Sequence, residues 1–173
     1  VDFSNETVAS HHQDGAQVVL GTNDRGIAVE NMSIALCNFM QLRDDVGGVI
    51  GIGGSGGTAL VAPMMQKMPI GIPKLLVSTV ASGNVEAYVG TSDISMMYSV
   101  VDFLGLNPIL KKILSNAGNS IAGMVKGLGD EIETNSEKKS IGLTMFGVTT
   151  TCVEALCQSF KERFNCLVFH ATG

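Results

Sequence analysis

The stretch that decides the fold is Val49-Ile50-Gly51-Ile52-Gly53-Gly54-Ser55-Gly56-Gly57-Thr58, in which an apolar run meets a dense group of glycines. The segment Val46–Ile52 has no polar side chain, which predicts a strand buried on both faces, as in a parallel sheet. A helix is expected from about Ser55 to Met68, because Pro69 stops it. This order of strand, glycine-rich turn and helix places free N–H groups at the positive end of a helix dipole, which is an anion site.

Glycine occupies seven of the eleven residues from 47 to 57, a density kept where the backbone adopts a positive φ or is approached closely. Gly51–Gly56 fits G-x-G-x-x-G, but no acidic residue occurs from Thr58 to Val85 to anchor a dinucleotide ribose. The stretch also resembles a P-loop with Gly57 in place of lysine. A phosphate would then be held by amides and hydroxyls. The alternative is a turn that serves only close helix–sheet packing.

Strand-like and helix-like patterns alternate along the chain, which predicts an α/β fold: an open, mainly parallel Rossmann-like sheet with helices on both faces. Asp24 can cap the first long helix. The expected strands are residues 18–20 (weak), 46–52, 74–77 and 94–101, and the expected helices are 26–43, 55–68 and 108–128.

A polar, charged stretch at 129–140 separates two parts of the chain and is expected to be a linker. Residues 1–128 would form a nucleotide-binding domain. Residues 141–173 would form the first βαβ of a second α/β unit, with strands at 141–146 and 167–169. A piece of this size cannot bury a core alone, so it either packs on the first unit or begins a second domain whose remainder is missing. We expect the second, which makes the chain a fragment of something longer.

Two further loops carry small hydroxyl side chains and are expected beside the glycine-rich turn, because ligands of such sheets bind at the carboxyl ends of the strands. The residues concerned are Ser78, Thr79, Ser82 and Gly83 in one loop and Gly90, Thr91, Ser92 and Asp93 in the other. The carboxylate of Asp93 could hold Mg²⁺ through water, or it could form an Asx turn or cap. Lys74 begins a predicted strand and would lie at the opposite edge.

Composition excludes several classes of function. A formal net charge of −5 argues against nucleic acid as the main ligand. No run of about 18 apolar residues is present, so no membrane span is predicted. The four cysteines lack zinc-site spacing and are expected to be reduced thiols of a cytoplasmic protein. No catalytic triad is specified, and His170, at the end of a predicted strand, is the one visible candidate for a base.

The motifs together resemble the Tm-1-like ATP-binding family, also called UPF0261, from about Gly47 to the end of the chain. They are 53–58 (GGSGGT), 69–74 (PIGIPK), 78–83 (STVASG), 88–93 (YVGTSD), 115–118 (SNAG) and 145–150 (MFGVTT). The resemblance implies a two-domain Rossmann-like protein that binds ATP with magnesium and tends to form homodimers. It also implies that this chain lacks the family's first strand and helix and most of its second domain.

The leading hypothesis is therefore an ATP-binding protein that holds the phosphates on the amides of the glycine-rich turn. The residues expected to bind are Gly53, Gly54, Ser55, Gly56, Gly57 and Thr58, with hydroxyl donors Ser78, Thr79 and Ser82 and with Mg²⁺ near Thr91 and Asp93. One alternative is an enzyme acting on a nucleotide-linked or phosphorylated metabolite, with His170 as base. Another is a protein-interaction module that ATP tightens, its partner unknown.

Overall fold

The computed structural model describes residues 2–129 and 137–171, and the chain divides into two compact units, Val1–Gly129 and Asp130–Gly173. Most of the expected linker, 129–140, lies outside the described residues. In the part of the chain that is described, no helix is both long and apolar enough to cross a membrane.

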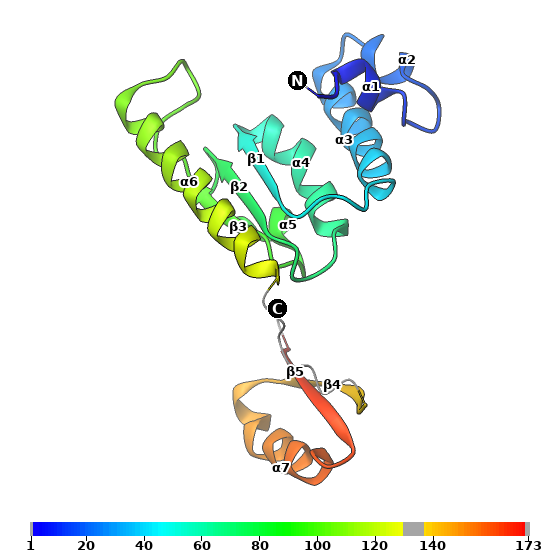
Figure 1. The fold of residues 1–173 in the computed structure, drawn as a ribbon, viewed down its shortest axis with the longest axis vertical. Helices are drawn as coiled ribbons and strands as arrows, with labels where there is room; N and C mark the ends of the chain where they lie inside the picture. Colours follow the sequence, from blue (N-terminus) through cyan, green and yellow to red (C-terminus); the bar gives the residue numbers. More distant parts are fainter. Residues whose placement is uncertain (1, 130–136, 172–173) are drawn as a thin grey trace. The chain divides into compact units, whose positions relative to one another are not determined.

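The first unit is built on a sheet of three parallel strands, β1 (Val49–Gly53), β2 (Lys74–Ser78) and β3 (Ser95–Tyr98), in the order β1-β2-β3 (Figure 1). The register pairs Gly53 of β1 with Ser78 of β2, and Ser78 in turn with Tyr98 of β3. All three strands therefore end at the same edge. The predicted α/β fold with a parallel sheet is confirmed.

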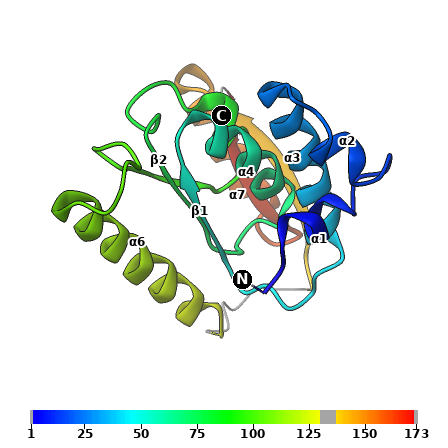
Figure 2. The same ribbon diagram turned by 90° about the horizontal axis from the view of Figure 1, so that it is seen from above.

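The central strand β2 holds the core of this unit. All of its residues are buried, because a helix covers each face. Leu76 packs in a cluster with Met65 of α4 (Ser55–Lys67), whereas Leu75 and Val77 pack against Ala117 of α6 (Pro108–Lys126). Figure 2 shows α6 and α4 on opposite sides of the sheet.

The strand β1 is less buried than the sequence predicts. Ile50 and Ile52 keep 38% and 49% of their surface exposed, so burial on both faces is wrong for this strand. Their register partners are Leu75 and Val77, which places them on the face that α6 covers. The described part of the sheet ends at β1, and α6 packs over β2 rather than over β1.

Three helices precede the sheet, α1 (Asn5–Ala9), α2 (Gln17–Leu20) and α3 (Arg25–Gln41). The weak strand expected at 18–20 is wrong, because this segment is α2, whose Val19 packs with Ala9 and Ala35. The predicted cap is confirmed, since the N–H of Ile27 donates to Asp24 Oδ1 over 3.0 Å. A short helix, α5 (Glu86–Val89), lies between β2 and β3.

The second unit is a βαβ, as predicted. Its strands β4 (Lys139–Met145) and β5 (Phe164–His170) are parallel, and α7 (Thr150–Phe160) connects them. Both strands begin before the residues predicted for them. Short 3-10 turns follow α6 at Gly127–Gly129 and precede α7 at Gly147–Thr149.

A buried lysine fixes the amino edge of the first sheet. The side chain of Lys74 is 0% exposed, and its ammonium donates to the carbonyls of Pro69 and Ile72, each over 2.9 Å, and to Asp93 Oδ1. The second oxygen of Asp93 accepts the N–H of Gly71 over 2.7 Å. Asp93 thus ties the start of β3 to the start of β2. Gly71 has a φ of +95°, which glycine adopts readily.

The pKa of Asp93 reflects this setting. Desolvation raises it, but the hydrogen bonds from Lys74 and from the N–H of Gly71 outweigh desolvation, so the pKa lies below its ordinary value. A carboxyl whose pKa is lowered on folding stabilises the protein above its unfolded pKa, about 3.9, and loses that contribution as the pH falls through the folded value.

We expect Asp93→Asn to lower the free energy of unfolding at pH 7 by about 1–3 kcal/mol, since the buried ammonium loses its counter-charge. The wild-type protein should lose stability below about pH 4 more steeply than the variant does. Urea unfolding at several pH values measures both effects, with the exposed carboxylate of Asp44, changed to Asn, as control. Equal stabilities and parallel pH curves would contradict this role.

Candidate functional site

The loops that follow the three parallel strands come together at the carboxyl edge of the first sheet. The N–H of Thr79 donates to the carbonyl of Gly53 over 3.3 Å, and the N–H of Ser99 donates to the carbonyl of Ser78 over 3.1 Å. The glycine-rich turn therefore lies beside the loop after β2, as the sequence predicts. Ligands of open parallel sheets bind at this edge.

Two buried hydroxyls join the turn to β2. Thr58 Oγ1 and Ser78 Oγ are 2.6 Å apart, and both residues are 0% exposed. The Thr58 hydroxyl donates to the carbonyl of Gly54 over 2.8 Å, and Ser78 Oγ accepts the N–H of Val80 over 3.2 Å. The Ser78 hydroxyl must then donate to Thr58. These side chains hold the turn in place, and their hydrogen bonds are directed inside the protein.

The glycines of the turn are explained by close approach. Among the described residues, positive φ values of glycine occur at Gly15, Gly71, Gly90 and Gly105, none of them in the turn. A Cβ on Gly53 would lie 3.0 Å from the Cα of Gly57, and a Cβ on Gly51 would lie 2.7 Å from Leu76 Cδ1. Without a Cβ, Gly53 allows the turn to be tight, and Gly51 allows β1 to pack closely against its neighbours.

An arginine that the sequence analysis missed lies at the turn. A Cβ on Gly56 would lie 3.3 Å from Arg25 Nη2, so the guanidinium of the first residue of α3 sits at the start of α4. Arg25 is far from the turn in sequence. The available signal was the direction of the two helices, since α3 leads into β1 and α4 connects β1 to β2, so that both begin at the carboxyl edge.

The helices α3 and α4 run side by side in the same direction. Arg25 lines a groove with Gly56 near the two helix starts, and further along Cys37 lines a second cavity with Met64 and Lys67. The positive ends of both helix dipoles therefore lie at the same edge. Asp24 caps α3, whereas Gly54 offers α4 no side-chain cap. The first N–H groups of α4 remain available to an anion.

The other residues predicted in the loop after β2 also lie at this edge. A Cβ on Gly54 would lie 3.6 Å from Thr79 Oγ1, so the Thr79 hydroxyl faces the turn. Ser82 and Gly83 are exposed in the same loop.

The loop that follows β3 contains one strained residue. Exposed Val100 has a φ of +64°, which is unfavourable for a β-branched residue and costs about 1–3 kcal/mol.

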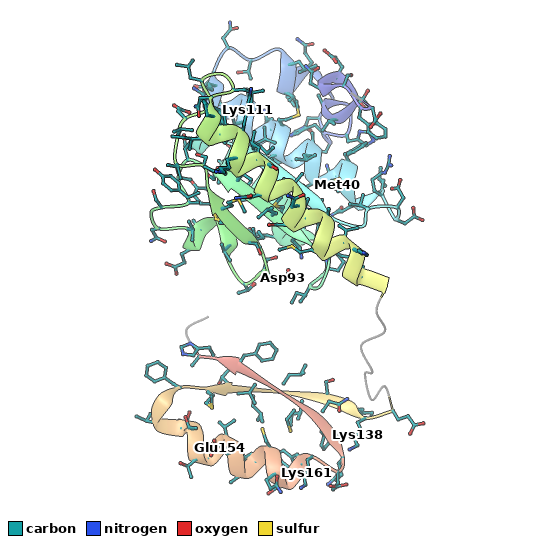
Figure 3. All side chains as sticks on the ribbon, turned by 60° about the vertical axis from the view of Figure 1, so that its left-hand side comes forward. Met40, Asp93, Lys111, Lys138, Glu154 and Lys161 are labelled. Atoms are coloured by element: carbon teal, nitrogen blue, oxygen red, sulfur yellow. The ribbon has the colours of Figure 1, made fainter. Side chains whose placement is uncertain are left out.

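The loop that contains Gly90, Thr91, Ser92 and Asp93 is not brought to the turn. It precedes β3 and therefore lies at the amino edge, with Gly90 at a φ of +54° after α5. Figure 3 shows Asp93 near the end of α6, whereas Lys111, in the first turns of that helix, lies at its other end. The predicted magnesium role of Asp93 stays a prediction, but this carboxylate is occupied by Lys74 and Gly71.

Neither a metal cluster nor a base is visible at the turn. In the described ranges, no group of three or more His, Cys, Asp or Glu side chains could hold a metal ion. His170 ends β5 in the second unit, where its ring meets Phe146 edge-to-face at 5.8 Å between centroids. All four cysteines are free thiols.

We expect Thr58→Val to lower the free energy of unfolding by about 1–3 kcal/mol, because Ser78 and Gly54 lose a buried partner while the shape is kept. Chemical denaturation measures the change. Thr151→Val is the matched control, since Thr151 is an exposed threonine of a helix and should change stability by less than about 0.5 kcal/mol. Equal effects of the two substitutions would show that the buried pair contributes nothing.

Two protein-family models match the chain. The model of the N-terminal domain of the uncharacterised protein family UPF0261 matches residues 1–129, and that of the C-terminal domain matches residues 138–173. A UPF0261 protein of Rhizobium meliloti (strain 1021) is 50% identical over 173 residues, 100% of this chain and 43% of the relative.

Two proteins of Solanum lycopersicum are also similar. The ToMV resistance protein Tm-1(GCR237) is 49% identical over 159 residues, which are 86% of this chain and 21% of that protein. The ToMV susceptible protein tm-1(GCR26) is 48% identical over the same length. The chain thus spans less than half the length of these relatives. Because the two family models match nearly all of its residues, the chain belongs to the UPF0261 family.

Proposed function

We propose that the first unit binds a nucleotide through its phosphates, and that the nucleotide is ATP, as the resemblance to the Tm-1-like proteins implies. The observation that carries the proposal is the position of the Arg25 guanidinium against Gly56 at the start of α4. It supplies the positive charge that the missing P-loop lysine would otherwise provide.

The start of α4 also supports phosphate binding at the turn. The first intrahelical bond runs from the N–H of Thr58 to the carbonyl of Gly54 over 2.9 Å. The N–H groups of Ser55, Gly56 and Gly57 precede it and have no partner within the helix. Together with the Thr79 hydroxyl and Arg25, they form a set of hydrogen-bond donors without bulk, which suits phosphate oxygens.

The expected affinity is modest. A helix terminus stabilises an anion by about 0.3–1 kcal/mol when exposed and by up to about 2 kcal/mol when partly buried. A hydrogen bond to a charged group, here from Arg25, adds about 1.5–3 kcal/mol. Their sum is far below the roughly 12 kcal/mol of a nanomolar complex, so we expect micromolar or weaker binding.

Magnesium would reach the site on the nucleotide. Mg²⁺ at nucleotide sites keeps several waters and binds substrate phosphates with one or two carboxylates. Asp93 does not fit that role at the turn, because it lies at the other edge of the sheet and is paired with Lys74. The ion would neutralise phosphate charge, and the donors at the turn would bind and orient the phosphates.

The alternatives receive less support. Catalysis would need a base, and His170, the candidate, belongs to the second unit. An interaction module remains an alternative, but the resistance and susceptible tomato proteins are almost equally similar to this chain. Overall similarity therefore does not carry the resistance property to this protein.

We expect Arg25→Gln to weaken ATP binding by about ten-fold or more through loss of one charged hydrogen bond. Gly56→Val should weaken it further, since a branched side chain would cover the first amides of α4. Isothermal titration calorimetry with ATP, with and without magnesium, and with NAD measures both effects. Lys126→Gln removes an exposed charge from the end of α6 and is the control. Unchanged ATP affinity in folded Arg25→Gln and Gly56→Val variants, or tighter binding of NAD, would contradict the proposal.

A further inference from the structure

A groove with a volume of about 640 Å³ leads away from the glycine-rich turn between α3 and α4. Arg25 and Gly56 line its start, and Ile34 and Pro63 line it further along the two helices. Its size falls within the range of about 300–1,000 Å³ that small-molecule sites occupy. The groove therefore continues the proposed phosphate site into a space large enough for the rest of a ligand.

The walls of the groove are mostly apolar. Val29 and Ile34 contribute from α3, and Ala59 and Pro63 contribute from α4. Ile34 keeps 38% of its surface exposed. An apolar, open wall beside a cluster of cationic and N–H donors suits an amphipathic anion, whose charged end lies at the turn and whose flat apolar part lies against Ile34 and Pro63.

Two polar atoms of the groove lack ordinary partners. Ser33 lines the groove and is 7% exposed, yet its hydroxyl has no hydrogen bond among the described residues. A serine inside a helix often donates to the carbonyl four residues earlier, and Ser33 does not. Pro63 has no N–H, so the carbonyl of Ala59 lacks its usual helical donor. The Ala59 residue is exposed, so both atoms can accept a hydrogen bond from a ligand in the groove.

The order of residues along α3 matches the order of groups in a nucleotide. Arg25 lies at the phosphate end, Glu30 follows with an exposed carboxylate that can accept ribose hydroxyls, and Ser33 and Ile34 lie beyond it. The Ala59 carbonyl accepts N–H donors, and the Ser33 hydroxyl can donate or accept. This combination suits the edge of a heteroaromatic base.

We propose that the groove between α3 and α4 receives the nucleoside of the bound nucleotide, with Ser33 and the Ala59 carbonyl hydrogen-bonding to the base. The inference rests on the proposed function, because the phosphates must first lie at the turn. It assigns base recognition to α3 and α4, away from the sheet itself, and it assigns specificity to Ser33.

The test compares ATP with inorganic tripolyphosphate, which offers phosphates but no nucleoside, by calorimetry on the 173-residue chain. Ala59→Leu would fill the groove, and Ala122→Leu, on the exposed side of α6, is its control. Ser33→Ala removes the hydroxyl, and Ser115→Ala, also exposed on α6, is its control. We expect Ala59→Leu to weaken ATP at least about ten-fold and Ser33→Ala to weaken it about five-fold, with tripolyphosphate unchanged in both.

The outcomes separate the two proposals. Unchanged ATP affinity in both groove variants, alongside a loss in Arg25→Gln, would overturn the groove inference and leave the phosphate site standing. If the wild-type chain binds neither ATP nor tripolyphosphate, both proposals fail. If Ala59→Leu weakens the binding of both ATP and tripolyphosphate, the Ser33→Ala variant decides. A loss of affinity for ATP alone in that variant supports the inference, and any other result overturns it.

Discussion

The hydrogen bond between the buried hydroxyls of Thr58 and Ser78 is the interaction on which the site depends. It joins the last residue of the central strand β2 to the first turns of α4, and through Thr58 it also holds the carbonyl of Gly54. Because both hydroxyl protons are donated inside the protein, these side chains hold the turn in place and do not donate to a ligand. The N–H groups that precede Thr58 are then the groups left for a ligand.

The direction of the helices brings the positive charge of Arg25 to the start of α4. The helix α3 leads into β1 and α4 connects β1 to β2, and both run opposite to the strands, so both begin at the carboxyl edge of the sheet. Arg25 follows the capping residue of α3, and its guanidinium reaches the start of α4 although the two segments are far apart in the sequence. The same rule places Lys74 and Asp93 at the other edge, where they hold the strand starts together. We therefore propose the carboxyl edge as the binding edge, whereas the contacts at the amino edge hold the strands together.

Local patterns were sufficient to predict the strand, turn and helix at 49–67, because an apolar run, glycines and Pro69 act over short distances. They also predicted the Asp24 cap. The strand predicted at 18–20 is wrong, since packing of Val19 against Ala9 and Ala35 in a helix overrides its strand propensity. Arg25 and Ser33 could not be found in this way, because their proximity to α4 is tertiary. The loop at 90–93 lies at the amino edge and not at the predicted carboxyl edge, because a loop that precedes a parallel strand lies at its amino end.

Phosphate binding at the start of α4 is the central proposal, and NMR tests it most directly. Titration of the ¹⁵N-labelled chain with ATP should shift the backbone amides of Ser55, Gly56 and Gly57 and the side-chain Nε–H of Arg25 more than any others in the first unit. No shift at these groups, or the largest shifts in the loop at 90–93, would contradict the account.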